Sequence, residues 1–187
     1  MAHLGTSVEY AMHCLLWLAG PLAEPASSRD LAELQGISPS FLAKIFPKLE
    51  KAGIVEASEG IRGGYRLARP ADDITVLDVV DAVEGHKPLF DCQEIRGRCA
   101  LYGNNPPLRA TTGICGIHAV MLRAEQSMRQ ELARTTLGDL DRSTSKKMSP
   151  GFSDQVQEWL SDRVTARTEA RLSPTKDPPA ERRRRKA

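Results

Sequence analysis

The chain has no stretch of about 20 consecutive apolar residues, the length that a membrane-spanning helix needs. The early apolar run LLWLAG, residues 15–20, has neither a basic segment before it nor a small-residue cleavage site after it, so we expect no secretory signal. C-x-x-C pairs and glycine-rich phosphate loops are missing too, which argues against a thiol redox enzyme or a nucleotide-binding enzyme. These absences predict a cytoplasmic protein, not an enzyme, with no membrane partner and no small-molecule substrate.

The net charge is only +2 over 187 residues, so bulk composition does not point to a nucleic-acid partner. The distribution of charge is more informative, because a local basic cluster can follow a phosphate backbone whatever the total. One cluster ends the chain as ERRRRKA, and another falls within residues 38–69: Lys44, Lys48, Lys51, Arg62, Arg66 and Arg69.

Apolar spacing and capping residues predict three helices followed by a hairpin. The helices are expected over residues 6–20, from Ser28 to Gly36, and from the N-cap Ser38 to Gly53, with Pro47 kinking or shortening the third. The alternating runs IVEAS and GYRLAR around EGIRGG predict a β-hairpin. This order is typical of a winged helix-turn-helix, so the fold class expected is mainly α with a small β-hairpin wing.

In that fold the third helix enters the major groove of double-stranded DNA and the hairpin tip reaches the adjacent minor groove. A solvated charged face is the plainer interpretation of each basic residue alone, and the helix order with the Gly-Gly wing favours DNA contact. The expected DNA-binding residues are Ser28, Ser38, Ser40, Lys44, Lys48, Arg62, Gly63, Gly64, Tyr65 and Arg66.

The rest of the chain divides by periodicity. We assign residues 1–84 to the DNA-binding domain, with a Thr75-x-x-Asp78 capping box at its last helix. Residues 85–114 form an irregular loop, and residues 115–140 a long helix. A linker and a further helix occupy residues 141–172, and residues 173–187 are expected to be a disordered basic tail.

Cys92, Cys99, Cys115 and His118 give the spacing C-x6-C-x15-C-x2-H in and just after the irregular loop. Thiols in backbone without regular structure can be aimed at one ion, although this spacing fits neither a zinc finger nor a ferredoxin. The alternative is that free cysteines act as small buried hydrophobes, which suits Cys14 in the first helix better than the polar loop.

Several blocks in this order resemble the winged-helix transcriptional regulators that carry iron–sulfur clusters. They are VEYAMHCLLWLA, SPSFLAKIFPKLEKAGIVEASEGIRGGYRLARP, ITVLDVVDAVEG and the cysteine loop. The resemblance spans about residues 1–140, and Pro47 departs from it. It implies a homodimer in which the long helix packs against its partner, and a cluster near that interface whose state alters DNA affinity.

The family uses more than one ligand set, and two can be placed on this sequence. One would use Cys92, Cys99, Cys115 and His118, although the gap between Cys99 and Cys115 is longer than that pattern has. The other, found in the redox-sensitive branch, takes two loop cysteines with a Glu and a His from the partner's first helix. Glu9, His13, Cys92 and Cys115 match it, and VEYAMHC and CQEIR resemble that branch closely.

Helical geometry favours the second set. At 100° per residue, Glu9 and His13 fall about 40° apart and away from the apolar stripe of their helix. Their Cβ atoms would lie about 5–6 Å apart, close enough to ligate one iron. The plainer alternative is a solvated Glu-His pair without function.

The resulting hypothesis is a transcriptional repressor whose [2Fe–2S] cluster acts as a redox switch. Imidazole ligation would raise the reduction potential of such a two-iron cluster. The alternatives are a [4Fe–4S] cluster that senses nitric oxide, a zinc or thiol site without a cluster, a thiol enzyme with Cys92 or Cys99 as nucleophile, and a dimeric scaffold that binds protein.

Overall fold

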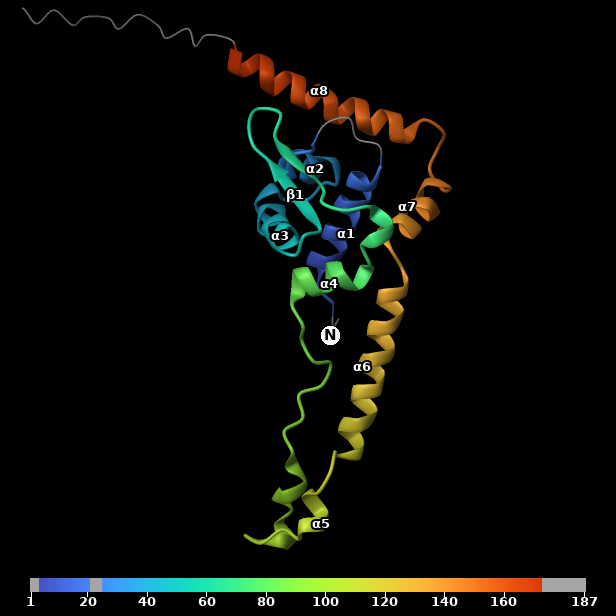
Figure 1. Ribbon diagram of the computed structural model, residues 1–187. Coiled ribbons are helices and arrows are strands. Elements are labelled where there is room, and N and C mark those ends of the chain that lie inside the picture. The colour runs from blue at the N-terminus through green and yellow to red at the C-terminus, as the bar shows by residue number, and fades with distance from the viewer. Residues whose placement is uncertain (1–3, 21–24, 173–187) are drawn as a thin grey trace, which may run out of the picture.

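The computed structural model describes residues 4–20 and 25–172. Within these ranges, residues 6–84 form a compact head, a long arm extends from it, and the last helix lies across it (Figure 1). The structure is mainly α with one antiparallel hairpin, as predicted. The expected basic tail, residues 173–187, lies outside the described residues.

The first three helices of the head are α1 (Thr6–Ala19), α2 (Ser28–Leu34) and α3 (Pro39–Lys51). Ser27 caps α2, since its hydroxyl accepts the backbone N–H of Asp30 at 3.1 Å. Pro39 begins α3 at a position where its missing N–H costs nothing. The expected shortening at Pro47 does not occur: α3 continues to Lys51, because Pro47 is exposed and water can reach the carbonyl of Ala43 that loses its N–H partner.

The wing consists of β1 (Val55–Ser58) and β2 (Gly64–Leu67), which pair from Val55↔Leu67 to Ser58↔Gly64. Its second strand also pairs with the segment before α2 through an isolated bridge between Ala26 and Tyr65. That bridge joins the wing to the segment that precedes α2, so the hairpin is fixed to the helical head.

One hydrophobic core joins these elements to α4 (Val76–Glu84). The predicted capping box is present at α4, where Thr75 and Asp78 exchange backbone–side-chain hydrogen bonds. Among the largest fully buried side chains are Leu15, Leu31, Leu42, Phe46, Leu49, Ile54, Ile74 and Leu137. Because α1, α2, α3 and α4 all contribute to this core, the helices of the head form one packed unit.

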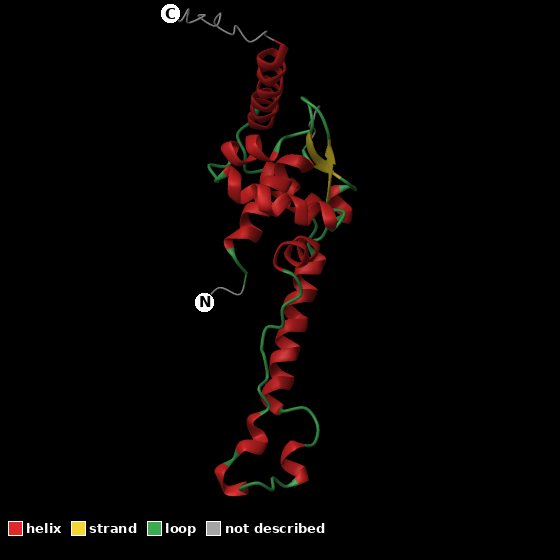
Figure 2. Cartoon of the chain, turned by 90° about the vertical axis from the view of Figure 1, so that its left-hand side faces the viewer, coloured by secondary structure: helices red, strands yellow, loops and turns green. Residues whose placement is uncertain are grey.

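The arm consists of the cysteine loop, which we define as residues 85–115, and α6 (Gly116–Arg134) beside it (Figures 1 and 2). The loop contains the short helices η2 (Ile95–Arg98), η3 (Ala100–Tyr102) and α5 (Leu108–Thr111). Arg129 anchors the base of α6 to α4 through two hydrogen bonds to Asp81, at 2.9 and 2.7 Å. No residue of α6 is buried, and the cysteine loop contacts it along one side, where the carboxylate of Glu125 accepts the backbone N–H of Leu89 at 3.1 Å.

The long helix expected over residues 115–140 is divided in two. α6 ends at Arg134, and α7 (Leu137–Ser145) begins after two extended residues. Thr136 caps α7 in a second capping box with Asp139, while Thr135 accepts the backbone N–H of Val76 at 2.9 Å. The break returns the chain to the head, where Leu137 is fully buried.

Helix α8 (Phe152–Leu172) closes the described structure and lies over α2 (Figure 1). Val156, Leu160 and Val164 are its buried residues. The polar centre of this contact is Asp30, which is only 3% exposed and accepts hydrogen bonds from Ser27 Oγ (2.7 Å), Arg163 Nε (3.2 Å) and Arg167. Burial alone would raise the pKa of Asp30, but these hydrogen bonds outweigh it and hold the pKa below the usual value.

We expect Asp30→Asn to lower the free energy of unfolding at pH 7 by about 1–3 kcal/mol, because the arginines lose a charged acceptor in a buried site. A depressed carboxyl pKa contributes stability that is complete above about pH 5 and is lost as pH falls through the folded pKa. The difference in the free energy of unfolding between the variant and the wild type should therefore become smaller in acid, at pH values below 3.8, the carboxyl pKa in the unfolded chain. Urea unfolding at a series of pH values measures it.

Asp162→Asn, on the exposed side of α8, is the matched control and should change stability little. A loss that is equal for the two variants, or that does not depend on pH, would contradict the role assigned to Asp30.

Candidate functional site

The expected recognition face lies on the exposed side of α3. Ser40 and Lys44 are exposed, and the opposite side of the helix is buried, with Leu42, Ile45, Phe46 and Leu49 in the core. Ser38 and Ser40 share a hydrogen bond between their hydroxyls at 2.9 Å. Lys48 is engaged differently: its ammonium donates to the carbonyl of Val83 at 2.7 Å and ties the end of α3 to α4.

The wing presents two arginines. Arg66 pairs with Glu56 across the hairpin at 2.5 Å, with 69% and 50% of these side chains exposed. Such a pair is screened by water and weak, so a phosphate can replace the glutamate as its partner. Arg62, at the hairpin tip next to Gly63, lines a recess between the wing and α8 together with Ser161, Val164, Thr165, Thr168 and Glu169.

Two wing residues expected to contact DNA have packing roles. Tyr65 packs against Phe46 with ring centroids 4.5 Å apart, and burial, followed by the charge of Glu50, raises its pKa. Gly64 passes so close to Ala26 that an added Cβ would lie 2.6 Å from the carbonyl carbon of Ala26. Ser28, also expected at the DNA, is half-buried as the first residue of α2.

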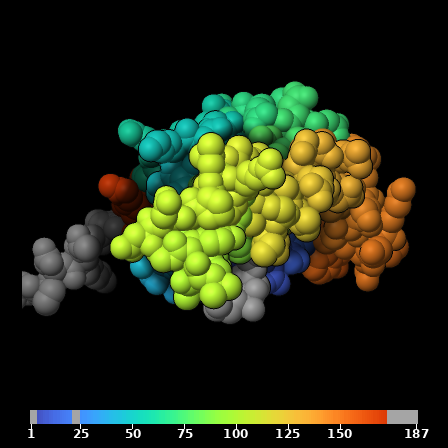
Figure 3. Space-filling model, turned by 90° about the horizontal axis from the view of Figure 1, so that it is seen from below, coloured from blue at the N-terminus to red at the C-terminus, as the bar shows by residue number. Residues whose placement is uncertain are grey.

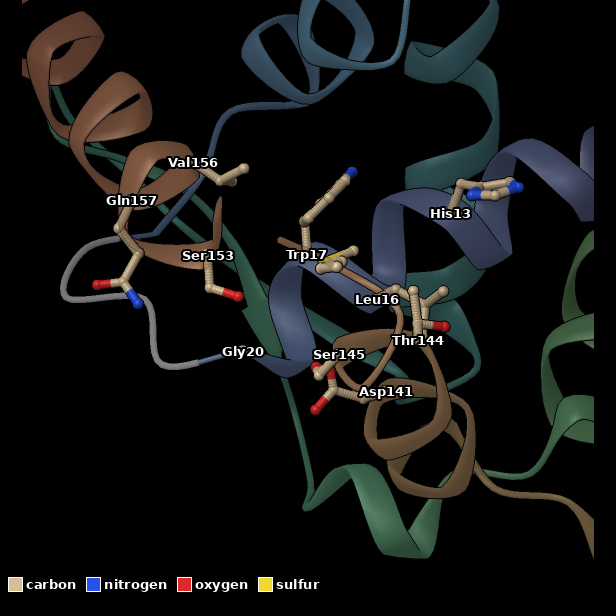
Figure 4. Close-up of a pocket in the computed structure, with 11 residues that line it drawn as sticks. His13, Leu16, Trp17, Gly20, Asp141, Thr144, Ser145, Ser153, Val156 and Gln157 are labelled. Atoms are coloured by element: carbon tan, nitrogen blue, oxygen red, sulfur yellow. The ribbon is translucent and has the colours of Figure 1, made fainter. Parts of the chain in front are cut away.

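Glu9 and His13 are both exposed on α1, on the side away from the buried Val8, Ala11, Leu15 and Leu18. His13 stands at the edge of a pocket formed by α1, α7 and α8, and its ring points away from Trp17 and Val156 (Figure 4). The adjacent Cys14 is fully buried, and burial raises its pKa to about 12. Cys14 is therefore a protonated core residue, which confirms its predicted role as a small hydrophobe.

Arg96 is the centre of the cysteine loop. Its guanidinium donates to the carbonyls of Thr111 (3.1 Å), Thr112 (3.4 Å) and Gly113 (2.8 Å), and to both carboxylate oxygens of Glu94 (2.5 and 2.7 Å). The acceptors precede Cys115 by two to four residues, and Glu94 follows Cys92 by two. One side chain thus connects the two halves of the loop.

The conformation of Glu94 serves this contact. Its φ of 45° is the one positive value at a non-glycine residue in the described ranges, a conformation that costs about 1–3 kcal/mol and persists where its surroundings require it. The hydrogen bond from Arg96 is the largest cause of a lowered pKa at Glu94, and the charge of His118 adds to it. Glu94 and Arg96 therefore form one ion pair within the loop.

The remaining candidate ligands differ in exposure. Cys92, Cys115 and His118 are half-buried, whereas Cys99 is exposed, and His118 lies beside Phe90 with ring centroids 6.1 Å apart. Arg96 links the segment that follows Cys92 to the segment that precedes Cys115, and no such link is made at the exposed Cys99 by the hydrogen bonds of Arg96.

The loop lies at the far end of the arm, and α1 lies in the head (Figures 1 and 2). Viewed along the arm, the loop projects in front of the rest of the molecule (Figure 3). Residues 4–20 and 25–172 contain no group of three or more His, Cys, Asp or Glu side chains placed to hold a metal ion. Within one chain, therefore, Glu9 and His13 do not meet Cys92 and Cys115.

Arg96 and Glu94 were not among the site residues expected from the sequence. The signal that could have identified them is an acid and an arginine shortly after Cys92, in the block CQEIR.

Among the described residues, none of the helices combines the length and the apolar character that crossing a membrane requires.

Comparison with known proteins gives a consistent result. Residues 4–142 match the family model Rrf2, described as an iron-dependent transcriptional regulator. Protein rrf2 of Nitratidesulfovibrio vulgaris is 36% identical over 76% of this chain and 89% of its own. The HTH-type transcriptional regulator IscR of Photobacterium profundum is 33% identical over 71% of this chain and 70% of its own.

Solved structures show the same fold. CymR, the global cysteine regulator of B. subtilis, superposes with a TM-score of 0.60 at 23% identity, over 76% of this chain and 98% of its own. T. potens IscR superposes with a TM-score of 0.59 at 24% identity, over 81% and 95%. These identities support the fold and carry no assignment of ligands.

The cysteines differ enough in environment to be separated chemically. In the metal-free native protein at pH 8, we expect iodoacetamide to modify exposed Cys99 and to leave Cys14 unmodified, because the thiolate is the reactive form and Cys14 is both buried and protonated. Peptide mass spectrometry before and after unfolding in urea reads both sites. Equal labelling of Cys14 and Cys99 in the native protein would contradict the burial of Cys14.

Proposed function

Since the chain belongs to the Rrf2 family, whose members are DNA-binding transcriptional regulators and not enzymes, we propose that it is a redox-responsive repressor. It binds operator DNA as a homodimer and carries a [2Fe–2S] cluster at the interface. The observation that carries the proposal is the separation of two exposed ligand-type side chains on α1 from two thiols at the end of the arm. A second copy of the chain is the natural way to join them.

The surface of the arm supports a homodimer. Along α6 and the cysteine loop, large apolar side chains are exposed: Ile95, Leu101, Leu108, Ile114, Ile117, Val120 and Leu122. Exposed apolar groups in such number mark an interaction surface. In a two-fold dimer each chain offers the same surface, so each arm would cover the other and each loop would approach the partner's α1.

The donor set fits an iron–sulfur cluster. Two thiolates, an imidazole and a carboxylate are ligands that iron accepts, and Cys92, Cys115, Glu9 and His13 supply them, with Glu9 and His13 from the partner subunit. When bound, such a cluster supplies a one-electron redox change.

The packing of α1 connects the proposed ligands Glu9 and His13 to α3, the proposed recognition helix. Tyr10, next to Glu9, meets Phe41 in the first turn of α3 edge-to-face, with ring centroids 5.4 Å apart. A displacement of α1 at Glu9 and His13 would therefore be felt at the start of α3, where Ser40 and Lys44 lie. In a dimer, the same displacement would change the spacing of the two heads.

The alternative ligand set remains a second candidate, with a [4Fe–4S] cluster or zinc held by Cys92, Cys99, Cys115 and His118. One observation favours it: His118 lies in the first turn of α6, directly after Cys115 and within the same chain as the three cysteines. The exposure of Cys99 counts against it, and in the described part of one chain these side chains are not placed to hold a metal ion.

We expect protein purified anaerobically to show the visible absorption of an iron–sulfur cluster and a reversible one-electron EPR signal. Glu9→Ala and His13→Ala should lower the cluster content to a small fraction of wild type or change the spectrum, because each removes a ligand, whereas Cys99→Ala should retain it. If Cys99→Ala loses the cluster and His13→Ala keeps it, the alternative ligand set is correct. A colourless protein with stoichiometric zinc would reject a cluster altogether.

Mixed dimers determine whether the ligands come from two chains. A dimer of one His13→Ala chain and one Cys115→Ala chain, purified through two different tags, keeps one intact site only if the histidine and the cysteine belong to different subunits. Such a dimer should hold about half of the wild-type cluster content, as two-fold symmetry requires. If both ligands belong to one chain, each site lacks a ligand and the mixed dimer should hold none.

Substitution of Lys44 tests whether the exposed side of α3 binds DNA. On a duplex selected from a random library with wild-type protein, Lys44→Ala should weaken binding by at least about tenfold and lower the log–log salt slope by about 1 per chain, because a phosphate contact is lost. Fluorescence anisotropy at several salt concentrations measures both. Lys147→Ala, an exposed lysine beyond α7, should change neither, and equal effects of the two substitutions would exclude α3 as the recognition helix.

A further inference from the structure

The contacts of Arg96 join two segments that are distant in sequence. The side chain lies in η2, shortly after Cys92, and its hydrogen bonds reach residues 111–113, shortly before Cys115. The backbone approaches closely at the same point: a Cβ added to Gly97 would lie 3.3 Å from Thr111 Cγ2. The loop is therefore closed across its middle by Arg96 and by the packing next to it.

The guanidinium is suited to this role by shape as well as charge. It is planar and carries five N–H donors in a fixed fork. Here the fork divides between a carboxylate on one side and three consecutive carbonyls on the other. A lysine ammonium has a positive charge but no fork, so it cannot hold both sides in one geometry.

The two segments joined by Arg96 each lie close in sequence to one thiol. Arg96 follows Cys92 by four residues, and the carbonyls that it binds precede Cys115 by two to four. By tying these segments together, the side chain limits how far apart Cys92 and Cys115 can lie, whether or not iron is bound.

We propose that Arg96 is a positioning residue that sets the separation of Cys92 and Cys115 before any cluster is bound. This inference rests on the proposed function for its purpose, since a preformed pair of thiols is what a shared cluster needs. It does not require that Arg96 contact the cluster. Glu94 assists by holding the other side of the fork, at the cost of its left-handed backbone.

The metal-free protein allows a test without iron. Phenylarsine oxide binds two thiols that lie close together, so its affinity reports their preorganisation. In a Cys99→Ser background, Cys92 and Cys115 are the two thiols outside the core. We expect this parent protein to bind one equivalent per chain, and Arg96→Ala and Arg96→Lys to bind it about 10–100-fold more weakly, as for other residues that orient ligands.

Arg98→Lys is the matched control. Arg98 lies in the same short helix and is exposed, so this substitution should leave the affinity unchanged. Failure of Arg96→Lys alongside a normal Arg98→Lys shows that the fork, and not the charge of η2, orders the thiols. Equal affinity of Arg96→Ala and the parent overturns the proposal. Circular dichroism of each variant separates a local effect from loss of the fold.

Cluster reconstitution separates this inference from the proposed function. If the parent binds the arsenical in an Arg96-dependent way but takes up no iron and sulfide, the positioning role stands and the cluster proposal fails. If the parent takes up a cluster and Arg96→Ala both binds the arsenical and loads the cluster as the parent does, the positioning role fails and the cluster proposal stands.

Discussion

The separation imposed by α6 is the constraint on which the rest of the structure depends. Its 19 residues span about 28 Å at 1.5 Å per residue, and its base is anchored to the head by Arg129 and Asp81. The cysteine loop is thereby carried away from the head that would read DNA. A chain built this way cannot bring Cys92 and Cys115 to its own Glu9 and His13, and its exposed apolar arm has no covering element in the described residues.

Local signals in the sequence predicted local features well. The capping box at Thr75 and Asp78, the hairpin around EGIRGG and the burial of Cys14 follow from short spacings. Features that depend on contacts between residues far apart in the sequence could not be predicted from short spacings. The break between α6 and α7 needs the pairing of Thr136 with Thr75. Likewise, the packing role of Tyr65 depends on Phe46, and that of Arg96 on carbonyls 15 or more residues away.

The same limit applies to the candidate site. Sequence spacing could place Glu9 and His13 on one side of a helix, because helical geometry is local. It could not show that Arg96, near Cys92, binds the carbonyls just before Cys115, because a loop with no periodicity has no rule that links its ends. The conformation of such a loop depends on the few side chains that close it, and here Arg96 and Glu94 do so.

Helix α8 shows how a regulator can extend its head beyond the family's common part. The family match ends at residue 142, yet α8 is bound to α2 by a nearly buried carboxylate and two arginines. Arg163 also pairs with Glu33 and lies over the ring of Trp159 at 4.6 Å. α2 and α3 share one core, so α8 packs on the head through α2, while Ser40 and Lys44 of α3 remain exposed. α8 also lies beside Arg62 at the wing tip, so this added helix borders the wing, one of the two elements that we propose contact DNA.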